Sequence, residues 1–105
     1  MTDKVYLKIH RSGASEVIAI CDPPLIGKHI RGSCHKLFIS ERFYLGMLVS
    51  KEEALNYIQK ASNVNLVGTI VSTLLERKWL NENAVLWLDD EELGQKIPHV
   101  IIFRP

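Results

Sequence analysis

The sequence predicts an α+β fold: a single two-layer domain in which a mainly antiparallel sheet is covered by two helices. Three observations lead to this prediction: alternation of apolar and polar residues near the amino terminus, helical periodicity in the middle, and two short apolar runs near the carboxyl terminus. The 105 residues, 47% hydrophobic and 24% charged, have the size and composition of one globular domain, residues 1–105. The expected order of elements is β-β-β-α-α-β-β.

A hairpin of two strands is predicted at the amino terminus. Residues 4–10 alternate between apolar and polar side chains, as in a strand that is buried on one face. Residues 16–21 form a continuous apolar run, which is typical of a central strand. Turn-forming residues at 11–15 lie between them, so the two strands are expected to pair antiparallel. Asp22-Pro23-Pro24 ends the second strand, because proline has no N–H to donate.

A third strand is predicted over residues 36–39 and is followed by a short helical turn. Ser40 is expected to cap this turn, which runs through Tyr44 and is ended by Gly46. Residues 25–28 are too short for a regular element, and we expect them to form a packed loop.

Two consecutive helices are expected in the middle of the chain. The first begins at Ser50, because Ser50 and Glu53 match the capping box S-x-x-E, and it stops near Ala61. The second is predicted over residues 64–80. Gly68 would lie inside it, and close approach of another backbone is the expected reason for a glycine there. The apolar stripe of this helix consists of Leu66, Val67, Ile70, Val71, Leu74 and Leu75.

Two further strands are predicted over residues 84–88 and 99–103. The acidic segment 89–92 lies between them in a polar connection that Pro98 ends. The order of its residues does not match the calcium loop of an EF-hand, so a solvated hairpin tip is the better interpretation.

Several functional classes are disfavoured by what the sequence lacks. No apolar stretch reaches the roughly 18 residues of a membrane span, and no apolar signal region follows the amino terminus, so we expect a cytoplasmic protein that does not enter a membrane. Cys21 and Cys34 are expected to be small buried side chains without a disulfide. No C-x-x-C pair, H-x-x-x-H pair or phosphate-binding glycine loop is present, and we expect no metal and no other cofactor.

Nucleophilic catalysis by a cysteine is also disfavoured. Cys34 and His35 are adjacent, and neighbouring side chains on a strand point to opposite faces. Cys21 is followed by Asp22, whose negative charge disfavours a thiolate. We therefore assign no catalytic residue.

Basic residues are concentrated in the first half of the chain. The net charge is only +1, but residues 1–60 carry nine Lys and Arg against six Asp and Glu. The polar face of the first strand combines lysines with Tyr6 and His10, and cations together with rings are what RNA-binding sheets use. An ordinary solvated sheet face explains the same residues, so both interpretations stay open.

Several short segments of the chain match a known family: residues 8–13, 21–22, 25–28, 40–44, 65–68 and 98–100, together with Ala54. In this order they resemble an archaeal family of small uncharacterised proteins, the domain of unknown function numbered four-two-four. No reaction or ligand comes with this resemblance. It implies a cytoplasmic archaeal protein and a setting near translation. It also draws attention to polar residues in the matching segments, such as Glu41 and Arg42. These two residues fit a binding role and a structural ion pair equally well.

The leading hypothesis is a non-enzymatic module that binds RNA or a ribonucleoprotein and is linked to translation. In this hypothesis cations contact phosphates, and Tyr44 is available for stacking on a base. The candidate binding residues are Lys8, His10, Arg11, Lys28, Arg31, Arg42, Tyr44, Asn65 and His99.

Two alternatives remain open. The first is a small enzyme in which His10, Arg11, Arg42, Asn65 and His99 form a pocket between the sheet and the second helix. The second is a protein-interaction subunit, possible as a homodimer, which predicts an exposed apolar patch that includes Trp79 or Trp87.

Overall fold

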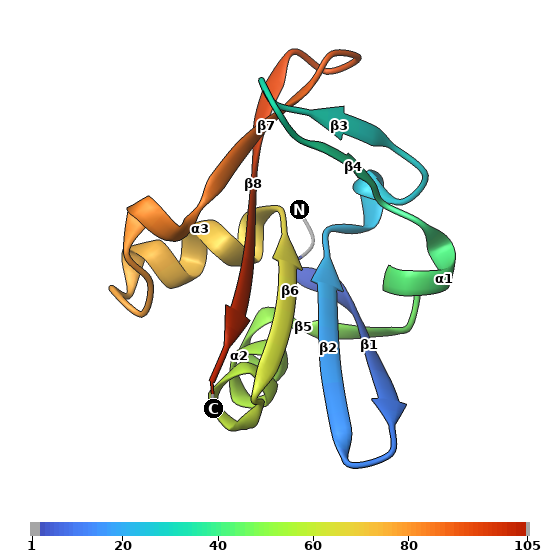
Figure 1. The fold of residues 1–105 in the computed structure, drawn as a ribbon, viewed down its shortest axis with the longest axis vertical. Helices are drawn as coiled ribbons and strands as arrows, with labels where there is room; N and C mark the ends of the chain where they lie inside the picture. Colours follow the sequence, from blue (N-terminus) through green and yellow to red (C-terminus); the bar gives the residue numbers. More distant parts are fainter. Residues whose placement is uncertain (1–2, 105) are drawn as a thin grey trace.

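The computed structural model describes residues 3–104 and shows an α+β fold built on one curled, mainly antiparallel sheet (Figure 1). The order of strands across the eight-stranded sheet is β4-β3-β7-β8-β6-β2-β1-β5. The strands are β1 (Lys4–Ser12), β2 (Ser15–Cys21), β3 (His29–Arg31), β4 (Lys36–Phe38), β5 (Met47–Ser50), β6 (Asn63–Val67), β7 (Leu86–Asp90) and β8 (Gln95–Phe103). The α-helices are α1 (Glu41–Tyr44), α2 (Lys51–Lys60) and α3 (Thr69–Glu76).

Local signals placed several elements correctly. The amino-terminal hairpin forms as predicted, with β1 and β2 antiparallel and Leu7 opposite Ile20. Ser40 caps α1, since its Oγ accepts a hydrogen bond of 3.1 Å from the N–H of Phe43. The capping box is confirmed as well: Ser50 Oγ accepts from the N–H of Glu53 at 3.1 Å.

The predicted second helix is wrong in its first part. Residues 63–67 form β6, which lies between β2 and β8 near the middle of the sheet. Val64 and Leu66 face α2 and α3, whereas Asn65 points to the opposite face. An apolar run that joins a strand to a helix satisfies both periodicities over a few residues, which is why the sequence pattern was misleading. The helix itself, α3, begins only at Thr69.

The predicted order of elements is therefore corrected. The short strands β3, β5 and β6 were missed, and β2 and β6 pair in parallel. The last two strands run over 86–90 and 95–103 instead of 84–88 and 99–103. Pro98 lies within β8 and does not end the connection before it; its carbonyl accepts a hydrogen bond from the N–H of Gly68 at 2.9 Å.

Two apolar clusters lie on opposite faces of the sheet. The larger cluster packs α2 and α3 against the inward side chains of β1, β2 and β6, including Leu7, Ile20 and Leu66. The smaller one packs Tyr44 of α1 and Ile30 of β3 against the other face of the sheet. The expectation of helices on one side only is thus incomplete, because α1 and the β3–β4 hairpin cover part of the second face (Figure 1).

Both cysteines are free thiols, as expected, but only Cys21 is buried. Cys34 is exposed in the turn between β3 and β4, which corrects the expectation of a buried side chain there. Among the helices within residues 3–104, none combines the length and hydrophobicity needed to cross a bilayer.

Candidate functional site

Three of the predicted site residues meet on the sheet face that is turned away from α2 and α3. The hydroxyl of Tyr44 donates to Asn65 Oδ1 at 2.7 Å, and Nε2 of His99 lies 3.0 Å from the same oxygen. Because a carbonyl oxygen only accepts, His99 must carry its proton on Nε2. We call Tyr44, Asn65 and His99 the polar cluster. Its two hydrogen bonds join α1, β6 and β8, although Tyr44 and Asn65 are 21 residues apart in the sequence and Asn65 and His99 are 34 apart.

One nitrogen of the polar cluster has no partner. His99 is only 3% exposed, and its Nδ1 is buried without a hydrogen bond in the part of the chain that the structure describes. Burial, and secondly the charge of the neighbouring His35, lower the pKa of His99 to about 4. The ring is therefore neutral at physiological pH, with a free lone pair on Nδ1.

A shallow pocket lies beside the polar cluster. Its volume is about 210 Å³, and His99 and His35 line it together with Ala84, Leu86 and Ile101. The rings of His35 and His99 are 6.0 Å apart between centroids and within 21° of parallel. We call this the histidine pocket. It lies on the opposite face from the predicted pocket between the sheet and the second helix.

His10 and Lys8 hold α1 against β1. Nε2 of His10 is 2.8 Å from the carbonyl oxygen of Phe43, and the two rings stack at 4.6 Å. The ammonium of Lys8 donates to the carbonyl oxygen of Arg42 at 2.6 Å. Arg11, by contrast, lies at the tip of the first hairpin, where it pairs with Glu16 at 2.9 Å. The structure thus brings His10 and Arg42 near Tyr44 but leaves Arg11 apart.

Two predicted binding residues are used for internal contacts. The side chain of Lys28 is only 16% exposed, and its ammonium lies 3.6 Å from the buried carboxylate of Asp90 and 3.4 Å from the exposed carboxylate of Glu92. Tyr44 is only 1% exposed, so the prediction that its ring stacks on a base is wrong. The sequence does not show which segment folds over these two side chains, so it does not predict that they are used inside the fold.

The β3–β4 hairpin places cations and rings side by side. His29 is opposite Phe38, with ring centroids 4.4 Å apart, and Arg31 is opposite Lys36. All four side chains are exposed and line a concavity of about 370 Å³. We call these four residues the hairpin face. The sequence analysis assigns no element to residues 29–31 and so misses this face; the signal was Ile30, an apolar residue between polar neighbours.

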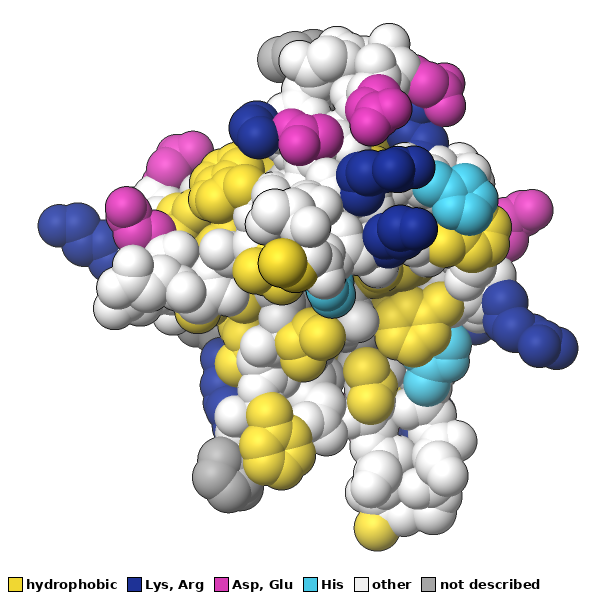
Figure 2. Space-filling view, turned by 45° about the horizontal axis from the view of Figure 1, so that its top comes forward, with side chains coloured by type: hydrophobic (Ala, Val, Ile, Leu, Met, Phe, Trp, Pro, Cys, Tyr) yellow, Lys and Arg dark blue, Asp and Glu magenta, His cyan; other side chains and the backbone are white. Residues whose placement is uncertain are grey.

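An apolar strip follows on the open part of the sheet. Leu86, Ile101 and Phe103 are 49%, 65% and 70% exposed, and they share the sheet face of His99. Figure 2 shows Lys and Arg side chains beside a histidine at the upper right, where Figure 1 places β3 and β4. Hydrophobic side chains lie below them, and no Asp or Glu side chain is visible among these. This face is therefore apolar, and the Lys and Arg side chains at its border have Asp and Glu side chains directly above them.

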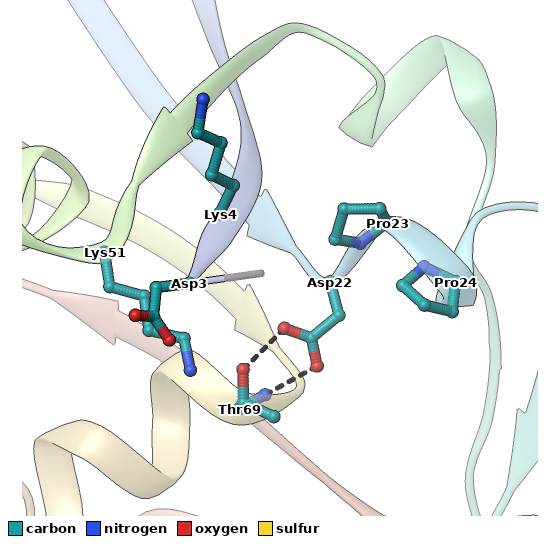
Figure 3. Close-up of a pocket in the computed structure, with 7 residues that line it drawn as sticks. All are labelled: Asp3, Lys4, Asp22, Pro23, Pro24, Lys51 and Thr69. Atoms are coloured by element: carbon teal, nitrogen blue, oxygen red, sulfur yellow. Dashed lines mark hydrogen bonds between the residues drawn. The ribbon is translucent and has the colours of Figure 1, made fainter. Parts of the chain in front are cut away.

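Another pocket lies near the start of α3, and the polar contacts among its residues serve to stabilise the fold. Figure 3 shows the carboxylate of Asp22 directed at Thr69, while Lys4 extends away from it. Asp22 accepts from the N–H of Thr69 at 2.8 Å and from its hydroxyl at 2.6 Å, which caps the helix. Gly68 precedes α3 with φ +104°, and the close approach at this glycine is made by the Asp22 side chain instead of another backbone.

Metal binding receives no support within residues 3–104, since no group of three or more His, Cys, Asp or Glu side chains is arranged around a common point. The buried thiol is also unsuited to nucleophilic chemistry. Burial, and secondly the charge of Asp22, raise the pKa of Cys21 to about 12.

The two thiols are expected to differ sharply in reactivity. A disulfide reagent such as DTNB should label Cys34 in the folded protein, because this side chain is exposed, and should label Cys21 only after unfolding in guanidinium. The released chromophore counts the thiols. In the C34S variant the folded protein should show no rapid labelling; rapid labelling there would contradict the placement of Cys21.

Comparisons with known proteins agree with this fold and leave the activity open. The sequence profile of a family described as "Protein of unknown function (DUF424)" matches residues 10–103. Among curated proteins, none matches. The crystal structure of an uncharacterized conserved protein from Methanopyrus kandleri is similar, with a TM-score of 0.69 and 28% sequence identity over 97% of this chain and 94% of that chain.

Proposed function

Because this chain belongs to the DUF424 family, a family of unknown function, we propose its role from geometry: it is a non-enzymatic module that binds RNA. The hairpin face provides the central contacts. Arg31 and Lys36 contact phosphates, and the rings of His29 and Phe38 lie beside them for contacts with bases or sugars. Arg42, exposed on α1 and without an ion pair within residues 3–104, is a further cation available to the RNA.

The observation that carries this proposal is the pairing of Arg31 with Lys36. Like charges directly opposite each other destabilise an antiparallel pair, and these strands have only three residues each. Arg31 is also opposite Asp89 on β7, whose carboxylate pairs with Lys96 at 2.7 Å, and it lies 3.9 Å from the carboxylate of Glu91. Asp89 and Glu91 are 48% and 76% exposed, so their carboxylates compensate only part of the repulsion between Arg31 and Lys36. A phosphate between the two cations removes this repulsion.

Salt dependence tests the proposal. We expect a fluorescently labelled 12-nucleotide RNA to bind tightly at 50 mM salt and weakly at 200 mM. In the R31Q/K36Q variant the slope of log affinity against log salt should fall in magnitude by about 0.7, because the two cations share one phosphate contact. Fluorescence anisotropy measures both quantities.

A matched control removes the same charge from elsewhere. Lys60 and Lys78 are exposed near the ends of α2 and α3, so K60Q/K78Q should retain the wild-type slope. Absence of binding at low salt, or an equal change of slope in the two double variants, would show that the hairpin face does not bind RNA.

A further inference from the structure

We infer that the RNA bound by this protein is single-stranded, and that one unpaired base enters the histidine pocket while its neighbours lie on the apolar strip. This inference rests on the proposed function and adds to it the class of RNA and the place of the bases. It follows from three features of the open sheet face: its continuity with the hairpin face, its exposed apolar side chains and the unpartnered nitrogen of His99.

The hairpin face and the histidine pocket are adjacent. His35, which lines the pocket, immediately precedes Lys36 of the hairpin face. The turn is closed by a 2.7 Å hydrogen bond from the N–H of Gly32 to the carbonyl oxygen of His35, and it holds the His35 ring over His99. An RNA strand whose phosphate lies at Arg31 and Lys36 continues past the turn that holds His35 to reach the pocket.

The apolar strip favours bases over phosphates. Ile101 and Phe103 are two residues apart on β8, so they lie on one face about 7 Å apart along the strand, with Leu86 of β7 on the same side. Double-stranded RNA presents its charged backbone and sugars, and its bases are stacked inside the helix. An unpaired base can instead lie flat on an exposed ring such as Phe103.

The histidine pocket supplies the polar contact. Its volume of about 210 Å³ suits one planar heterocycle, and the Nδ1 atom of His99 is an acceptor without a donor. Each nucleobase has an N–H donor on its Watson–Crick edge, and this edge is free only in unpaired RNA. Nδ1 is buried in the structure, so the side chains around it shift as the base enters, and the exposed ring of His35 then stacks on the base.

Comparison of single-stranded with duplex RNA tests this inference. A labelled 12-nucleotide RNA should bind at least about tenfold more tightly alone than after annealing to its complement, because only the free strand offers bases for stacking. The F103A and H35A variants should each lose about tenfold in affinity for the single strand and keep the wild-type salt slope. Both side chains are exposed, so thermal unfolding should be close to that of the wild type.

Tyr57, an exposed ring on α2, provides the matched control, and Y57A should bind as the wild type does. Equal affinity for single strand and duplex, or unchanged binding by both F103A and H35A, would overturn the inference even if R31Q/K36Q still lowers the salt slope. If the wild-type protein binds neither single-stranded nor duplex RNA at low salt, the proposed function itself is overturned. A dimer in light scattering that F103A converts to a monomer would assign the strip to a second copy of the chain and overturn the inference too.

Discussion

Replacing Gly68 by alanine is expected to lower the free energy of unfolding by about 3 kcal/mol. A side chain at φ +104° is strained, which costs about 1 kcal/mol. The new Cβ would also overlap the carboxylate of Asp22, which must then move. Asp22 accepts two hydrogen bonds from Thr69, at 2.8 and 2.6 Å, and hydrogen bonds to a charged group are worth about 1.5–3 kcal/mol. The substitution therefore uncouples β2 from the start of α3.

Urea unfolding measures this loss, and Gly94 supplies the control. Gly94 also has a positive φ, +64°, but a Cβ there would meet no heavy atom within 4 Å. G94A should therefore cost only the backbone strain, about 1 kcal/mol. If G68A costs no more than G94A, the close contact between Gly68 and Asp22 does not contribute to stability.

Stability is expected to decrease by about 3 kcal/mol between pH 6.5 and pH 4 because of His99. The pKa of His99 is lowered to about 4 in the folded protein from an ordinary value of 6.5, chiefly by burial and secondly by His35. Between these two pH values the unfolded chain binds a proton that the folded protein does not, so acid favours unfolding. The contribution is fully present above pH 6.5 and is lost as the pH falls toward 4.

The H99Q variant isolates this effect from the titration of carboxylates. Glutamine can still donate to Asn65 but does not titrate, so the variant should lose about 3 kcal/mol less than the wild type over the same pH range. Chemical denaturation at a series of pH values gives the two curves. His29 is exposed, and H29Q should follow the wild-type curve. Parallel curves for H99Q and the wild type would contradict a buried neutral His99.

Several basic residues show why charge alone did not identify the binding surface. Lys28 pairs with Asp90 and Glu92 across the fold. Arg104 donates to the carbonyl oxygens of Ile58 and Ala61 at 2.8 and 3.1 Å, which caps the end of α2. Such cations are fixed by groups distant in the sequence. Arg31 and Lys36 have no comparable buried partner, and this difference is visible only in three dimensions.

The elements predicted correctly are those that short-range forces specify. Alternation of apolar and polar residues predicted the first hairpin. Two serines, each capping the N–H group three residues further on, predicted α1 and the start of α2. β3 and β6 were missed because short strands in a sheet are stabilised by distant partners: β6 depends on β2 and β8, and the segment Asn63–Val67 carries no local signal that separates strand from helix.

The sequence by itself determined the α+β class, the hairpin and the capped helix, because hydrophobic period, turn residues and caps act over a few residues. Only the tertiary structure decided that Tyr44 is buried, that Tyr44, Asn65 and His99 share hydrogen bonds, and that Arg31 faces Lys36. These contacts depend on strand register and on which segments cover the second sheet face. Register and coverage are set by packing of the whole chain, which no local pattern encodes.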